Sequence, residues 1–180
     1  PNEFIFGGVI TACERPNEFI FGGVITACER GRQWEKALDL FNSMEDRGVQ
    51  PDVITFSAAI SACEKAGQWE KALELFNSME DRGVQPNVIT FNAAISACEK
   101  GGKWEKALKL FHSIEGRGVQ PDVITFNAAI SACGKGGKWE KALELFNSME
   151  DHVVEPDVIT FNACIEALHA AARFDKACAL

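Results

Sequence analysis

The sequence lacks the features that mark membrane proteins and metal sites. Its longest apolar run, around Phe19 to Cys28, is too short to span a bilayer and is broken by two glycines. The 3 histidines do not recur at the same intervals as the 7 cysteines, and no two cysteines have the spacing of metal ligands. We therefore expect no membrane association, no metal site and no bound cofactor.

A catalytic constellation is also missing. Residues 134–138, GKGGK, resemble a phosphate-binding loop, but Trp139 stands where that loop needs a serine or threonine after its lysine. The acidic residues are spaced like those on the exposed face of a helix, and none is paired with a residue that could act as a catalytic base. We expect neither enzymatic activity nor a small-molecule substrate within this chain; an enzyme domain encoded outside it stays open.

Positive charge is scarce, with 18 lysine and arginine residues against 26 acidic residues and a net charge of −8. This balance weighs against a nucleic-acid partner, because lysine and arginine usually dominate affinity for phosphate groups. The hydrophobic fraction of 47% is enough for a continuous core, so we expect a folded chain.

What the sequence does contain is one unit repeated along its length. Four tryptophans follow one another at intervals of 35 residues: Trp34, Trp69, Trp104 and Trp139. Cys28, Cys63, Cys98 and Cys133 recur at the same interval, which favours small buried hydrophobic residues in a reducing compartment over a disulfide or redox site. A fixed period of this length predicts stacked supersecondary units that share one core.

The period divides the chain into repeats. Residues 1–15 are identical to residues 16–30, so we expect residues 1–15 to form an orphan or frayed first-helix segment. Because the chain starts at Pro1 and stops within a repeat, we expect a piece of a longer array. The repeats are residues 16–52 (partly divergent), 53–87, 88–122, 123–157 and 158–180 (truncated).

Each complete repeat has the pattern of two helices. In residues 53–87, Asp52 can cap a first helix that ends at Lys65, and a second helix begins near Gln68. Gly83 suits the position just after the second helix. The second helix has one apolar stripe, formed by Trp69, Ala72, Leu73, Phe76 and Met79. The sequence thus predicts an all-α solenoid of stacked antiparallel helix-turn-helix repeats.

The first helix carries almost no charge, as expected for an element between neighbouring repeats. Phe56, Ala59, Ile60 and Cys63 are predicted to pack in the core. Its few polar residues share a face with an isoleucine and a lysine. The members of this stripe in the three complete repeats are Ile54, Ser57, Ser61 and Lys65; Ile89, Asn92, Ser96 and Lys100; and Ile124, Asn127, Ser131 and Lys135.

Stacking of the repeats would place one set of these stripe residues in each repeat at a regular spacing. This arrangement suits a ligand that is itself a periodic polymer. An aliphatic side chain can cover a base, a short polar one can bond a base edge, and a lysine can meet a phosphate. The acidic residues fall mostly on the second helix, at Glu70, Glu74, Glu80 and Asp81. Two alternatives stay open: a lightly polar solvated face, and a helical scaffold for a protein partner, which the acidic total favours.

The unit resembles the pentatricopeptide repeat, with VxTFN opening the first helix, WEKALELFNSM in the second and GVQPD closing it. Tetratricopeptide repeats share the hairpin but usually have a tyrosine in the first helix, and this chain contains 0 tyrosines. The resemblance implies a right-handed superhelix that binds single-stranded RNA, one base per repeat, in RNA metabolism of a mitochondrion or plastid.

The resemblance also implies roles for individual residues. The fifth residue of a repeat reads a base together with the last residue, so Ser57 with Asn87 implies adenine. Asn92 with Asp122, and Asn127 with Asp157, each imply uracil, which gives an A-U-U core. Asn162 opens a repeat whose partner residue lies beyond the sequence. The second residue sandwiches bases, at Ile54, Ile89, Ile124 and Ile159, and the lysine contacts phosphate, at Lys65, Lys100 and Lys135.

The repeat that starts at Glu18 departs from this pattern. Gly22 offers no side chain to act with Asp52, and Phe19 replaces the aliphatic second residue. The base for this repeat is therefore unspecified.

Overall fold

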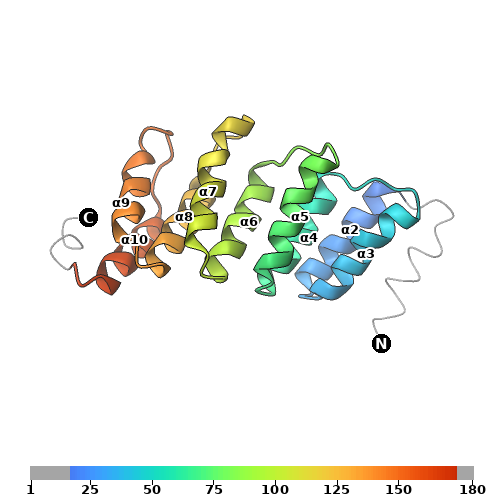
Figure 1. The fold of residues 1–180 in the computed structure, drawn as a ribbon, viewed down its shortest axis with the longest axis horizontal. Helices are drawn as coiled ribbons and strands as arrows, with labels where there is room; N and C mark the ends of the chain where they lie inside the picture. The colour runs from blue at the N-terminus through green and yellow to red at the C-terminus, as the bar shows by residue number, and fades with distance from the viewer. Residues whose placement is uncertain (1–16, 174–180) are drawn as a thin grey trace. The chain divides into compact units, whose positions relative to one another are not determined.

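A computed structural model describes residues 17–173. Within this range every regular element is helical, which confirms the predicted all-α class. The chain divides into an N-terminal unit, Pro1–Pro86, and a C-terminal unit, Asn87–Leu180, and each is described by itself. The helices are α2 (Glu18–Arg30), α3 (Trp34–Asp46), α4 (Val53–Lys65) and α5 (Trp69–Asp81) in the first unit (Figure 1). The second contains α6 (Val88–Lys100), α7 (Trp104–Ser113), the 3-10 turn η1 (Glu115–Arg117), α8 (Val123–Lys135), α9 (Trp139–Ser148) and α10 (Val158–Ala170).

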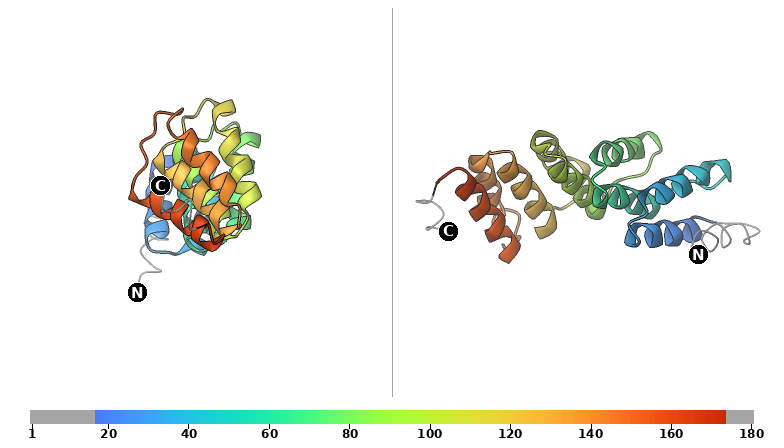
Figure 2. Two further views of the ribbon diagram at one scale, coloured as in Figure 1. Left: turned by 90° about the vertical axis from the view of Figure 1, so that its left-hand side faces the viewer. Right: turned by 90° about the horizontal axis from the view of Figure 1, so that it is seen from below.

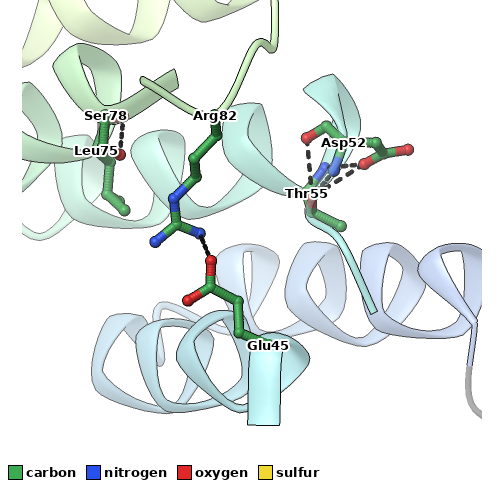
Figure 3. Close-up of polar contacts among 6 residues, drawn as sticks. All are labelled: Glu45, Asp52, Thr55, Leu75, Ser78 and Arg82. Atoms are coloured by element: carbon green, nitrogen blue, oxygen red, sulfur yellow. Dashed lines mark hydrogen bonds and ion pairs between the residues drawn. The ribbon is translucent and has the colours of Figure 1, made fainter. Parts of the chain in front are cut away.

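Local sequence fixes where each first helix begins. The Asp52 carboxylate accepts a 2.8 Å bond from the Thr55 amide, and the Asp52 amide donates a 2.8 Å bond to the Thr55 hydroxyl (Figure 3). This reciprocal capping box satisfies backbone donors that the helix itself leaves without partners. It confirms the predicted cap at Asp52. The same box recurs at Asn87–Thr90, Asp122–Thr125 and Asp157–Thr160.

The first helices pack against one another within each unit: α2 against α4, and α8 against both α6 and α10. Each second helix packs on its own first helix, as α3 does on α2 and α9 on α8; Figure 2 shows these hairpins from two further sides. The core lies between the layers. Phe56, Ala59, Ile60 and Cys63 are fully buried, as predicted.

The second helices α3, α5 and α7 are followed by a turn whose glycine adopts positive φ. Gly83 has φ of 68°, a conformation that costs other L-residues energy, so its predicted place after the helix is confirmed. Helix α7 is shorter than α5, 10 residues against 13. Gly116 stands where Asp81 continues α5, and the chain forms η1 there; α9 is also 10 residues long, with Asp151 at this position, so the glycine alone does not explain the shorter helix.

Val153 occupies the turn position of Gly83 and Gly118 but has φ of 57°. A β-branched residue is strained in this left-handed region. Because Val153 is 91% exposed, Val153→Gly removes strain without loss of packing. We expect the free energy of unfolding to rise by about 1 kcal/mol in chemical denaturation. The control Glu144→Gly, at an exposed position in the middle of α9, should instead lower it by about 0.5–1 kcal/mol; destabilisation by Val153→Gly would contradict the assigned strain.

The residue directly before the positive-φ turn residue links the second helices of neighbouring repeats. In the N-terminal unit the Arg82 guanidinium contacts the Glu45 carboxylate at 2.6 Å (Figure 3). In the C-terminal unit His152 takes this place, with Nε2 at 2.8 Å from Glu115 Oε1 and Nδ1 at 2.7 Å from the Ser148 carbonyl oxygen. The Ser148 carbonyl and then Glu115 raise the pKa of His152 above its usual 6.5.

This substitution predicts a pH dependence of stability. A raised folded-state pKa means that protonated His152 adds stability below the unfolded-state pKa, and that this stability is lost as pH rises through the folded-state pKa. The free energy of unfolding of the C-terminal unit should fall as pH rises above about 6.5, by less than about 1 kcal/mol as for other partly exposed pairs. His152→Arg should flatten this dependence in denaturation curves at each pH. An equal pH slope in both proteins would contradict the role of the imidazole.

Residues 1–15 lie outside the described residues, as does the end of the truncated repeat after residue 173. None of the helices between residues 17 and 173 is long and apolar enough to cross a membrane. The same range holds no group of three histidine, cysteine, aspartate or glutamate residues able to hold a metal ion.

Candidate nucleic-acid interface

The isoleucine near the start of each first helix points away from the core. Ile54, Ile89, Ile124 and Ile159 are 61%, 61%, 56% and 63% exposed. Phenylalanine two residues further on, for example Phe126, is fully buried in the three complete repeats, so the exposure is specific to the isoleucine position. These side chains are therefore available for contact with a ligand, although their predicted role beside bases stays a prediction.

The fifth and last residues of a repeat meet in the C-terminal unit. Asn92 Nδ2 donates to both carboxylate oxygens of Asp122, at 3.1 and 3.3 Å. The Thr125 hydroxyl donates to Asn92 Oδ1 at 2.6 Å, which fixes the orientation of the amide. Asp122 itself is held as the cap of α8. The predicted reading residues of this repeat thus form one ordered polar group.

The next repeat has the same arrangement. Asn127 Nδ2 donates to Asp157 Oδ1 at 3.1 Å, and the Thr160 hydroxyl donates to Asn127 Oδ1 at 2.6 Å. Hydrogen bonds from the Thr160 backbone amide and from the Asn127 and Thr160 side chains lower the pKa of Asp157. The carboxylate is therefore ionised at neutral pH and acts as an acceptor.

A cavity of about 270 Å³ lies between the exposed isoleucines of α8 and α10. Asn127 and Asp157 line it together with Ser96, Glu99, Ser131, Ala128, Ile124 and Ile159. Apolar side walls and a polar lining suit a flat ring with hydrogen-bonding edges. The cavity brings together the predicted reading residues of this repeat and the predicted sandwiching isoleucines of this repeat and the next.

The first predicted reading pair is divided between the two units, which are described separately. Ser57 is 8% exposed, and its hydroxyl donates to the Val53 carbonyl at 2.7 Å. Asn87 caps α6 by accepting from the Thr90 amide at 3.0 Å. Asn162 lies exposed on α10. The pairing of Ser57 with Asn87 stays a prediction.

The lysines predicted to contact phosphate make ion pairs with the preceding repeat. Lys65 Nζ lies 2.5 Å from Glu29 Oε1, and Lys135 Nζ lies 2.6 Å from Glu99 Oε1. Lys100 is exposed at the end of α6. The predicted phosphate role of all three lysines stays a prediction, but for Lys65 and Lys135 a phosphate would share or displace a carboxylate.

These glutamates were not predicted from the sequence. The acidic residues were expected mostly on the second helix, whereas Glu29 lies on α2 and Glu99 on α6, both first helices. Ser61 and Ser131 donate to the same carboxylate oxygens, at 3.0 and 2.8 Å. The available signal was the Glu-Lys dipeptide at Glu64–Lys65 and Glu99–Lys100, which places a glutamate 36 residues before the next lysine.

The repeat from Glu18 has an open reading position. A Cβ at Gly22 would lie 3.7 Å from its nearest neighbours, which is ordinary contact, so the backbone leaves space for a side chain. Phe19 is 83% exposed at the isoleucine position. The base for this repeat therefore stays unspecified.

The cysteines do not contribute to this surface. Cys28, Cys63, Cys98, Cys133 and Cys164 are free and buried, as predicted. Burial raises the pKa of the Cys98 thiol to about 11, so the reactive thiolate is scarce at neutral pH.

The chain is similar to solved structures of pentatricopeptide repeat proteins. PPR10 in complex with an 18-nt psaJ RNA element is 29% identical, with a TM-score of 0.77 over 93% of this chain and 24% of that chain. PPR10 from maize is 30% identical, with a TM-score of 0.70 over 91% of this chain and 24% of that chain. The chain therefore spans about a quarter of PPR10.

A third structure shows the same fold at lower identity. The PPR domain of Arabidopsis thaliana protein-only RNase P 1, in complex with tRNA, is 20% identical, with a TM-score of 0.79 over 89% of this chain and 84% of that chain. No curated protein sequence matches the chain.

Family comparison covers most of the described residues. The PPR repeat matches residues 19–49, the pentatricopeptide repeat domain matches residues 39–101, and the PPR repeat family matches residues 86–135 and 121–170. Together with the helical hairpins and the structural matches, these ranges show that the chain belongs to the pentatricopeptide repeat family.

Proposed function

We propose that these repeats bind single-stranded RNA, one base per repeat. The observation that carries this proposal is the cavity between Ile124 and Ile159, lined by the hydrogen-bonded pair Asn127 and Asp157. Two apolar side chains can cover the faces of a base while the polar pair meets its edge. The complex of PPR10 with an RNA element supports this reading, since that protein shares the fold at 29% identity.

The preferred core in this proposal is A-U-U. Uracil presents carbonyl acceptors on both sides of one N–H donor. An asparagine has a second N–H to give to a carbonyl, and an ionised aspartate accepts only, so the pair complements this edge. The pairs Asn92 with Asp122 and Asn127 with Asp157 then read the two uracils, and Ser57 with Asn87 reads adenine. In this proposal the RNA is that of a mitochondrion or plastid.

Affinity is expected to be modest. The chain carries a net charge of −8, and two of the stripe lysines are paired with glutamates. Stacking on an aromatic side chain contributes about 1–3 kcal/mol per base, and isoleucine should contribute less. Useful affinity would therefore come from the rest of a longer array.

Titration of the chain with short single-stranded RNA tests the proposal. Fluorescence anisotropy at low salt should show tighter binding to an A-U-U core than to a C-C-C control of the same length. Binding should weaken as salt increases, because phosphate contacts release counterions. Equal binding to both RNAs, or none, would contradict the proposal and would favour a scaffold that binds a protein partner.

A further inference from the structure

One carboxylate on the first-helix face holds two side chains of the following repeat. Glu99 Oε1 accepts from Ser131 Oγ at 2.8 Å and from Lys135 Nζ at 2.6 Å. Glu29 holds Ser61 and Lys65 in the same way, at 3.0 and 2.5 Å. We call each of these groups, Glu99–Ser131–Lys135 and Glu29–Ser61–Lys65, a carboxylate clamp.

The two charges of a clamp differ in accessibility. The Glu99 side chain is 16% exposed, whereas the Lys135 side chain is 55% exposed. Glu99 and Ser131 also line the cavity that contains Asn127 and Asp157, so the clamp borders the proposed base site. A phosphate joined to a base in that cavity would meet an accessible lysine whose charge the carboxylate already balances.

The clamp is absent as a whole where α10 packs on α8. There Gly134 stands in place of the glutamate, Glu166 in place of the serine and Ala170 in place of the lysine. A Cβ at Gly134 would lie 2.9 Å from the Ala167 Cβ, so this close approach has no room for a longer side chain without a shift. The three clamp residues are present together or replaced together, which indicates that they act as one group.

We propose that Glu29 and Glu99 set the RNA affinity of their repeats by competing with phosphate for the lysine of the next repeat. This inference rests on the proposed RNA binding and explains how a stripe with lysines can keep a low affinity per repeat. Glutamine at the same place keeps an acceptor for the serine and the lysine but removes the charge. Lys135 would then carry a positive charge that no carboxylate balances.

The test uses the full chain with Glu99→Gln and a single-stranded RNA that carries A-U-U. We expect binding to tighten about three- to tenfold at low salt, the effect of removing one like charge at about 4 Å through water. The plot of log affinity against log salt should steepen by about 0.7, the value for one more neutralised phosphate on a single strand. A role in folding alone would not change this slope.

Two further variants isolate the competition. Glu140→Gln makes the same change in net charge on the exposed start of α9, and we expect less than a twofold effect on affinity. In a Lys135→Gln background, Glu99→Gln should also change affinity less than twofold, because the contested lysine is gone. A gain that persists without Lys135 would overturn the competition and leave only a general charge effect.

The outcomes separate this inference from the function on which it rests. If neither the unchanged chain nor the Glu99→Gln variant binds RNA, the proposed function fails and this inference fails with it. If the unchanged chain binds A-U-U selectively and Glu99→Gln binds no more tightly, the inference alone is overturned.

Discussion

Phe126→Ala is expected to lower the free energy of unfolding of the C-terminal unit by about 3–5 kcal/mol. Phe126 is fully buried, and its ring meets Phe111 at a centroid distance of 4.9 Å and His152 at 5.3 Å. Alanine would leave a cavity where α7, α8 and the turn after α9 meet. In a repeat array such a loss also weakens the interface with the neighbouring repeat. Urea denaturation followed by circular dichroism measures the effect.

The matched control lies two residues away on the same helix. Ile124 is 56% exposed, so Ile124→Ala should change the free energy of unfolding by less than about 0.5 kcal/mol. If Ile124 covers a base, the same variant should weaken RNA binding. Similar stability losses for both variants would contradict the division of α8 into a core face and a ligand-binding face.

The double variant Asp122→Asn with Asp157→Asn has the largest expected effect on recognition. Asparagine keeps the capping function, since Asn87 caps α6 through the same capping box. It replaces an acceptor-only group with one that also donates, which changes the edge that the pair offers to a base. A well-placed pair of hydrogen bonds contributes about 1–3 kcal/mol of base discrimination in direct readout, so preference for uracil should fall roughly tenfold or more.

The fold was predictable because the sequence features that determine it are local and recur in each repeat. The Asp52–Thr55 cap, the apolar stripe from Trp69 to Met79 and Gly83 after the helix are each visible within one repeat. Val153 departs from this rule, since its positive φ is imposed by the turn and not by its own preference. The sequence could show the substitution of glycine but not that the chain keeps the same turn.

The candidate site was predictable only in part. The isoleucine and asparagine positions followed from helical spacing and from the family resemblance. The bond between Glu99 and Lys135 joins adjacent first helices, and its existence depends on their relative register, which no single-helix pattern contains. The burial of Ser57, which is 8% exposed, follows likewise from packing, because spacing alone placed it on the same face as the exposed Ile54.

The most direct test of the proposed base reading is the ratio of dissociation constants for U-U and C-C RNAs of equal length and flanks. It should be measured for the unchanged chain and for Asp122→Asn with Asp157→Asn, with thermal unfolding recorded for both. We expect the unchanged chain to prefer U-U by about tenfold, and the variant to lose that preference while its unfolding temperature stays within about 2 °C. A variant that keeps the full preference for U-U would contradict base reading by the asparagine–aspartate pairs.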